Sequence, residues 1–75
     1  MAIKKTERDD PLSCFNKAFD GEPIFILRGQ DLIAPGLVLQ WANRAAKNGT
    51  PAEKVEEARK IAAAMEAWPV RKYPD

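Results

Sequence analysis

The sequence contains no histidine and a single cysteine, Cys14. One cysteine excludes an intrachain disulfide, and without histidine the chain has no cluster with zinc-ligand spacing. A chain of 75 residues that lacks both buries barely enough apolar surface to offset the entropy lost on folding. We therefore expect association with further subunits to supply the missing stability.

Clustered cations and long apolar runs are also missing. The chain has 12 Lys and Arg against 11 Asp and Glu, a net charge of +1, whereas binding to a nucleic-acid backbone needs several clustered cations. The longest apolar stretch is too short to span a bilayer, and no signal-peptide core follows residues 1–10. The lone cysteine fits a reducing compartment. We expect a cytoplasmic protein that binds neither polymeric nucleic acid nor membranes.

The sequence offers no catalytic constellation. It contains no nucleophile–base pair, no paired carboxylates in a credible cleft and no metal-ligand set. Cys14 has no histidine to activate it, so we interpret it as a small buried apolar residue. We expect a non-enzyme without metal or cofactor.

Two helices are predicted in the second half of the chain. Gly49 suits the left-handed position that ends a helix, Thr50 is a good N-cap with Pro51 in the first helical position, and Glu53 completes a capping box. The first helix spans about 35–48, or begins at Asp31 if that residue is its N-cap. The second runs from 51 to about 67, where Trp68–Pro69 stops it.

Apolar spacing along these helices predicts an antiparallel αα-hairpin. The facing stripes place Trp41 and Trp68 in the core. The first helix carries a second apolar stripe, which a two-helix hairpin cannot cover. This excess indicates a homo-oligomer. The stripes comprise Ala34, Leu37, Val38, Trp41 and Ala45, with Leu39, Ala42 and Ala46 beside them, and Val55, Ala58, Ile61, Ala62, Met65 and Trp68 opposite.

Upstream, the pattern predicts one short helix over residues 11–18 with Asp10 as its N-cap. Residues 23–27 favour an extended conformation and, with no second strand to pair with, are expected to pack against the rest of the chain. Residues 1–9 and 70–75 are expected to be mobile unless an oligomer fixes them. The fold class is all-α, with a flexible stretch at 1–9 and a single helical domain at 10–75.

The polar residues Arg28, Gly29, Gln30 and Asp31 interrupt an apolar run that extends from 23 to 41. The Arg28 guanidinium suits a phosphate, although a surface pair with Asp20 or Asp31 is the plainer alternative. Gly29 serves either as a turn residue or as a close backbone approach to a ligand. Asp31 is interpreted as a helix N-cap in preference to a catalytic acid. The patch is a candidate site for a small anionic ligand.

These residues are part of a resemblance to a known protein family. The strings EPIFILRGQDLIAPGLVLQWA, PAEKVEEAR and MEAWP resemble the phage anti-CBASS type 2 family, small viral proteins that evade bacterial immunity. The similarity runs from about residue 10 to 72. It rests on Leu27, Arg28, Asp31, Ala34 and Pro35, and on the closing segment at 65–69.

The resemblance implies a short N-terminal helix followed by two long antiparallel helices, assembled into a homohexamer. It also implies a cyclic-oligonucleotide sponge. Such proteins sequester cyclic dinucleotides in pockets between subunits, and some hold cyclic trinucleotides near the threefold axis, without cleaving either.

The family's site residues carry over only in part. The base-stacking aromatic falls on Phe15. The cation of the dinucleotide site falls on Gln30, an amide, so Arg28 would supply the charge. A hydroxyl of the trinucleotide site falls on Leu32, and its arginine falls on Arg71. These departures put trinucleotide binding in doubt more than dinucleotide binding.

A second hypothesis needs no nucleotide. A small oligomeric helical adaptor would dock a host protein on its apolar helix face. Residues 28–31 would then form only a capping loop.

Overall fold

The structure, a computed structural model, describes residues 3–74. It contains α1 (Lys4–Asp9), α2 (Cys14–Lys17), α3 (Ala34–Lys47) and α4 (Ala52–Glu66). Within residues 3–74 extended pairing is limited to an isolated bridge between Asp31 and Lys72. The all-α prediction is confirmed at this level. The outermost parts of the two segments expected to be mobile, residues 1–2 and 75, lie outside the described residues.

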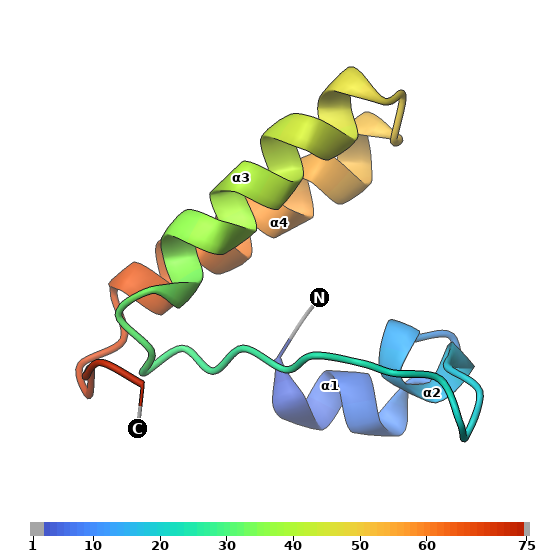
Figure 1. The fold of residues 1–75 in the computed structure, drawn as a ribbon, viewed down its shortest axis with the longest axis horizontal. Helices are drawn as coiled ribbons and strands as arrows, with labels where there is room; N and C mark the ends of the chain where they lie inside the picture. The colour runs from blue at the N-terminus through green and yellow to red at the C-terminus, as the bar shows by residue number, and fades with distance from the viewer. Residues whose placement is uncertain (1–2, 75) are drawn as a thin grey trace.

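Helices α3 and α4 lie side by side, run in opposite directions and form the largest unit of the molecule (Figure 1). Small side chains dominate the seam: Ala42, Ala45 and Val55 are buried together, with Ala58 packed against them. Ala34, Ile61 and Ala62 are also buried. Small side chains at a helix crossing bring the two backbones close together.

The prediction of a core position for Trp41 and Trp68 is wrong for the single chain. The two residues are 54% and 56% exposed. The seam follows Ala34, Ala42 and Ala45, which leaves the bulky indoles outside the close contact between the helices. The stripe at Ala34, Leu37, Val38, Trp41 and Ala45 is thus turned partly towards solvent.

The turn between α3 and α4 depends on Gly49, as predicted. Its φ of 84° is the left-handed conformation. The Thr50 N–H donates to Ala45 O at 3.0 Å and the Gly49 N–H to Ala46 O at 3.3 Å, the two bonds of a Schellman C-cap. The predicted capping box is wrong, because Pro51 is the N-cap of α4 and no side chain caps that helix. The Thr50 residue is engaged in ending α3 and does not begin α4.

Asp31 is not the N-cap of α3. Ile33 holds that position, and no side chain caps it. The Asp31 Oδ1 instead accepts a hydrogen bond from the Ile33 N–H at 2.8 Å, two residues along the chain. This local Asx turn closes the loop before the helix.

The N-terminal part contains two short helices where one was predicted. Residues 4–9 form α1, although they belong to the segment expected to be mobile. The second helix is shorter than the predicted range 11–18, and Ser13, rather than Asp10, caps it through its Oγ. The predicted burial of Cys14 is wrong, because the residue begins α2 at an exposed position. The Asp10 carboxylate accepts from the Leu12 N–H at 2.9 Å. Sequence reasoning missed α1 because it is polar and short.

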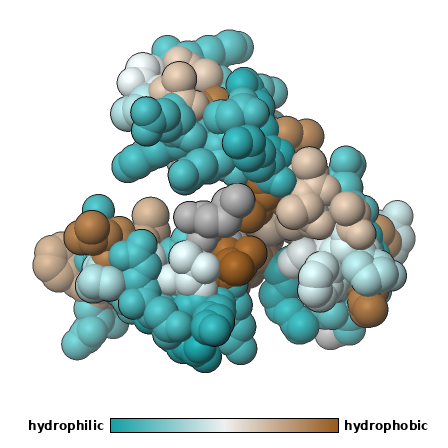
Figure 2. Space-filling view, turned by 180° about the vertical axis from the view of Figure 1, so that it is seen from behind, coloured by the Kyte–Doolittle hydropathy of each residue, from teal (hydrophilic) through white to brown (hydrophobic). Residues whose placement is uncertain are grey.

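The segment 23–27 is extended but does not pack as predicted. Ile24, Phe25 and Ile26 are 51%, 85% and 68% exposed. The segment runs from the N-terminal helices to the α3–α4 pair (Figure 1). The space-filling view shows an open hollow between the turn end of α3–α4 and the N-terminal helices (Figure 2).

Candidate functional site

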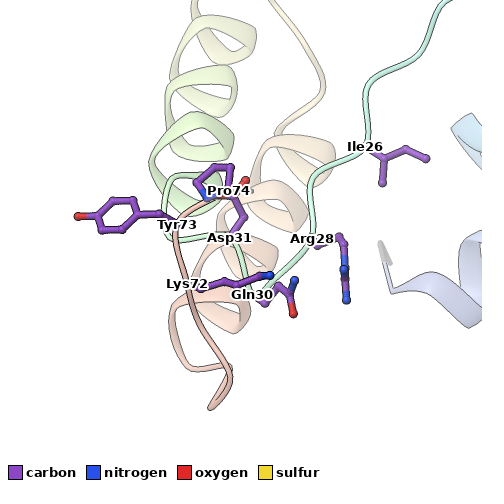
Figure 3. A pocket seen from close by; sticks show the side chains of 7 residues that line it. All are labelled: Ile26, Arg28, Gln30, Asp31, Lys72, Tyr73 and Pro74. Atoms are coloured by element: carbon purple, nitrogen blue, oxygen red, sulfur yellow. The ribbon is translucent and has the colours of Figure 1, made fainter.

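A pocket lies where the loop before α3 meets the C-terminal segment (Figure 3). Its volume is about 170 Å³. The loop contributes Arg28, Gln30 and Asp31, three of the four residues of the polar interruption. The complete lining is Ile26, Arg28, Gln30, Asp31, Lys72, Tyr73 and Pro74.

Main-chain hydrogen bonds join the two walls of this pocket. The Lys72 N–H donates to Gln30 O at 2.7 Å, and the Leu32 N–H donates to Lys72 O at 2.8 Å. These bonds form the parallel bridge between Asp31 and Lys72. The C-terminal segment, expected to be mobile, is therefore fixed to the loop in the described residues.

Arg28 lies on the exposed edge of the pocket and makes no ion pair with Asp20 or Asp31. Within residues 3–74 the only ion pair joins Arg8 and Asp9. The plainer alternative for Arg28, a surface salt bridge, is therefore not what the structure contains. Its guanidinium fork is available to an anion.

Gly29 turns the chain against the end of α4. A Cβ at this position would meet side-chain atoms of Met65 and Trp68 at 3.8 Å, an ordinary van der Waals distance. The glycine thus has room for a methyl group, and its role as a turn residue accounts for it. Its neighbour Gln30 contributes both an amide side chain to the pocket and the carbonyl that holds Lys72.

Arg71 and Leu32 lie near the pocket but do not line it. The Arg71 guanidinium points into the protein: Nη2 donates to Asp31 O at 3.3 Å and Nη1 to Glu66 O at 3.5 Å. Its Nε is buried without a hydrogen-bond partner among the described residues. Leu32 is 39% exposed, and its N–H takes part in the bridge.

Phe15 lies on α2, far along the chain from the pocket. The N-terminal helices contact each other and, within residues 3–74, make no helix contact with α3 or α4. Phe15 is 53% exposed. Within one protomer the structure therefore does not bring the predicted stacking aromatic to Arg28.

Sequence reasoning missed Lys72, Tyr73 and Pro74 as pocket residues. The only available signal was the basic-aromatic cluster at 71–73, which also fits a frayed tail. The bridge that fixes this cluster is a main-chain contact between Asp31 and Lys72, which are 41 positions apart. No side-chain pattern in the sequence indicates it.

The groups at the pocket suit binding. Two cationic side chains, an amide and one carboxylate line it. Over the described part of the chain no group of three or more Cys, Asp or Glu side chains is placed to hold a metal ion. Among the described helices none is long and apolar enough to cross a membrane.

Comparison with other proteins adds no relative: the chain matches no protein-family model, no curated protein and no solved structure. The class defined by the fold and the pocket is a small all-α protein with an open, cation-lined pocket.

Proposed function

We propose that this chain is a phage immune-evasion protein that binds and sequesters cyclic dinucleotides without cleaving them. The proposal combines the sequence resemblance with the groups at the pocket. A sponge needs affinity and no catalytic machinery, so cations and an amide beside an apolar edge suffice.

The observation that carries the proposal is the Arg28 guanidinium, which has no ion pair among the described residues and lies at the exposed rim of the pocket. The pocket of about 170 Å³ is smaller than the roughly 300–1,000 Å³ typical of small-molecule sites. A cyclic dinucleotide would fill it and extend beyond it. A second subunit would then complete the enclosure.

Exposed surface supports assembly. The chain exposes 6209 Å², whereas a compact monomer of 8.4 kDa is expected to expose about 4,600 Å². The excess of about 1,600 Å² on one chain is about twice the roughly 800 Å² that each partner contributes to a standard protein–protein interface. We propose that the antiparallel α3–α4 hairpin and the N-terminal helices pack against other copies of the chain in a homo-oligomer, a hexamer by resemblance.

An oligomer would also supply the stacking aromatic. A cyclic dinucleotide has two bases and two phosphates related by an approximate twofold axis, which a twofold subunit interface matches. Phe15 of one subunit would stack on a base beside Arg28 of another. Base–aromatic stacking contributes about 1–3 kcal/mol per base. Cyclic trinucleotides are the weaker candidates, because Leu32 offers no side-chain hydrogen bond and Arg71 bonds to main-chain carbonyls.

The test is calorimetric titration of the purified protein with 3′,3′- and 2′,3′-linked cyclic dinucleotides. We expect saturable binding, with the ligand recovered chemically intact after the protein is denatured. Absence of heat with every linkage would overturn the sponge hypothesis. Recovery of cleaved ligand would show hydrolysis in place of storage.

One observation favours the adaptor hypothesis as second candidate. Phe25 and Phe19 are 85% and 82% exposed, and exposed aromatics are typical anchors of protein interfaces. If self-assembly leaves these side chains accessible and no nucleotide binds, a partner protein is the better proposal. Protection of residues 19–26 from hydrogen exchange in the oligomer would count against it.

A further inference from the structure

We infer that Lys72 is the second cation of the ligand site, and that Arg71 is the residue that positions it. The identity of the ligand as a cyclic dinucleotide rests on the proposed function; the two-cation anion site rests on the pocket. Lys72 lies in the C-terminal segment and lines the same pocket as Arg28. In Figure 3 its side chain extends towards Gln30, on the side where Arg28 lies, whereas the Tyr73 ring points away.

The position of Lys72 is set by its main chain. Both bonds of the bridge use backbone atoms, Lys72 N to Gln30 O and Leu32 N to Lys72 O. The identity of the side chain at position 72 does not enter either bond. Substitution at this position therefore changes the charge at the pocket and keeps the main-chain donor and acceptor of both bonds.

Arg71 fixes the segment from the other side. Its two Nη atoms donate to the carbonyls of Asp31 and Glu66, which belong to the loop before α3 and to the last residue of α4. Its Nε is buried. A guanidinium held in this way joins the loop, α4 and the C-terminal segment, and it acts on the ligand only through the placement of Lys72.

The charges at the pocket favour an anion with separated oxygens. Arg28 and Lys72 are cations, and the Asp31 carboxylate is partly occupied because Oδ1 accepts from the Ile33 N–H at 2.8 Å. The lining groups together carry one net positive charge. A phosphodiester can take a bidentate contact from the Arg28 fork and a point charge from Lys72.

The first experiment compares Lys72→Ala, Lys72→Arg and the control Lys47→Ala by calorimetry with cyclic di-GMP, cyclic di-AMP and cyclic GMP–AMP. Lys47 is an exposed lysine at the opposite end of α3. Loss of one charge-assisted contact predicts that Lys72→Ala raises the Kd about tenfold or more. Lys72→Arg and Lys47→Ala should bind within about threefold of wild type. An unchanged Kd in Lys72→Ala overturns the assignment.

The second experiment separates positioning from contact. Arg71→Met should weaken binding and also speed hydrogen exchange at the Leu32 N–H, which donates to Lys72 O. Lys72→Ala should weaken binding without changing that exchange rate, and Arg71→Lys should restore part of both properties. Weaker binding in Arg71→Met with unchanged exchange at Leu32 would make Arg71 a ligand contact and overturn its positioning role.

A third measurement distinguishes failure of this inference from failure of the proposed function. Pyrophosphate is titrated into ¹⁵N-labelled wild type and Lys72→Ala, and amide shifts are followed over residues 28–32 and 71–73. We expect shifts in wild type that Lys72→Ala strongly reduces. If no cyclic dinucleotide binds but these shifts depend on Lys72, the anion site stands and the sponge hypothesis fails. The inference is overturned if Lys72→Ala binds dinucleotide or pyrophosphate as well as wild type does. It is also overturned if wild type binds neither ligand.

Discussion

Arg28 differs from the other arginine close to the pocket in what surrounds its guanidinium. Arg71 is bonded to two main-chain carbonyls, whereas Arg28 lies on the exposed rim without an ion pair among the described residues. An arginine whose guanidinium makes no ion pair within the protein can be replaced at little cost to the fold. Its removal therefore tests ligand binding almost alone.

We expect Arg28→Ala to raise the Kd for a cyclic dinucleotide about ten- to a hundredfold, as expected for a lost charge-assisted contact. The free energy of unfolding should stay within about 0.5 kcal/mol of wild type, as for most surface substitutions. Calorimetry and urea unfolding measure the two quantities. The matched control is Arg44→Ala, at an exposed position of α3. It should change neither the Kd nor the free energy of unfolding. Normal binding by Arg28→Ala would show that the site lies elsewhere.

Substitution by alanine is expected to have opposite effects on the free energy of unfolding at two glycines. Gly49 has a φ of 84°, and Gly36 lies in the first turn of α3, where an added Cβ would meet nothing within 4 Å. Left-handed backbone disfavours alanine, whereas a helical position favours it over glycine.

Gly49→Ala should lower the free energy of unfolding by about 1 kcal/mol. Gly36→Ala should raise it by about 0.5 kcal/mol. Urea unfolding at one fixed protein concentration measures both. Equal effects of the two substitutions would contradict a left-handed Gly49.

At the scale of elements, α1 depends on side chains outside itself. It has six residues, whereas isolated helices shorter than about 12–15 residues are marginal in water. The Asn16 Nδ2 lies 2.9, 3.0 and 2.8 Å from the carbonyl oxygens of Glu7, Arg8 and Asp10. The Ser13 Oγ donates to Glu7 O at 2.6 Å. These contacts tie the end of α1 to α2.

Asn16→Ala should therefore unfold α1 and leave the α3–α4 pair intact. Hydrogen exchange should become fast at residues 7–10 and remain unchanged at residues 42–45. Asn43→Ala is a matched control, because its side chain makes one contact at 3.4 Å with Arg59 and none with the described N-terminal helices. Equal exchange at residues 7–10 in both variants would show that α1 does not need Asn16.

Elements were predictable from sequence where a local signal determined them. The end of α3 at Gly49 was predictable, because the left-handed conformation of a C-cap depends on that one residue. The predictions that Asp31 and Thr50 are N-caps were wrong, because each residue makes a different local hydrogen bond. Asp31 forms an Asx turn, and Thr50 takes part in the C-cap of α3. The core position of Trp41 was wrong because apolar spacing does not show which part of an apolar face the neighbouring helix covers. The pocket's loop residues were predictable, whereas Lys72 depended on a long-range main-chain bridge.

At the scale of the molecule, the exposed apolar side chains are spread over every part of the chain. They include Phe15 and Phe19 near α2, Phe25 in the extended segment, and Trp41 and Trp68 on the α3–α4 pair. Burial of apolar surface at about 25 cal/mol per Å² favours association of such a chain. The exposed apolar surface is what the proposed homo-oligomer would cover.

We expect sedimentation equilibrium to give a mass several times 8.4 kDa, six times for the proposed hexamer. Trp41→Lys should lower this mass, because it places a charge where apolar surface is proposed to be covered. Glu57→Lys, on the exposed polar side of α4, is the control and should assemble normally. A single species of 8.4 kDa at all concentrations would contradict the oligomer.

If the pocket binds the proposed ligand, the bridge between Asp31 and Lys72 is expected to report its occupancy. The bridge consists of two main-chain bonds, and contacts of this size open locally at a low free-energy cost. A ligand that contacts both the loop and the C-terminal segment binds only when the bridge is formed. Its binding free energy then adds to the stability of the bridged form. The same two amides that form the wall would report bound ligand through slowed exchange. Occupancy could thus be read at Leu32 and Lys72 without any label on the nucleotide.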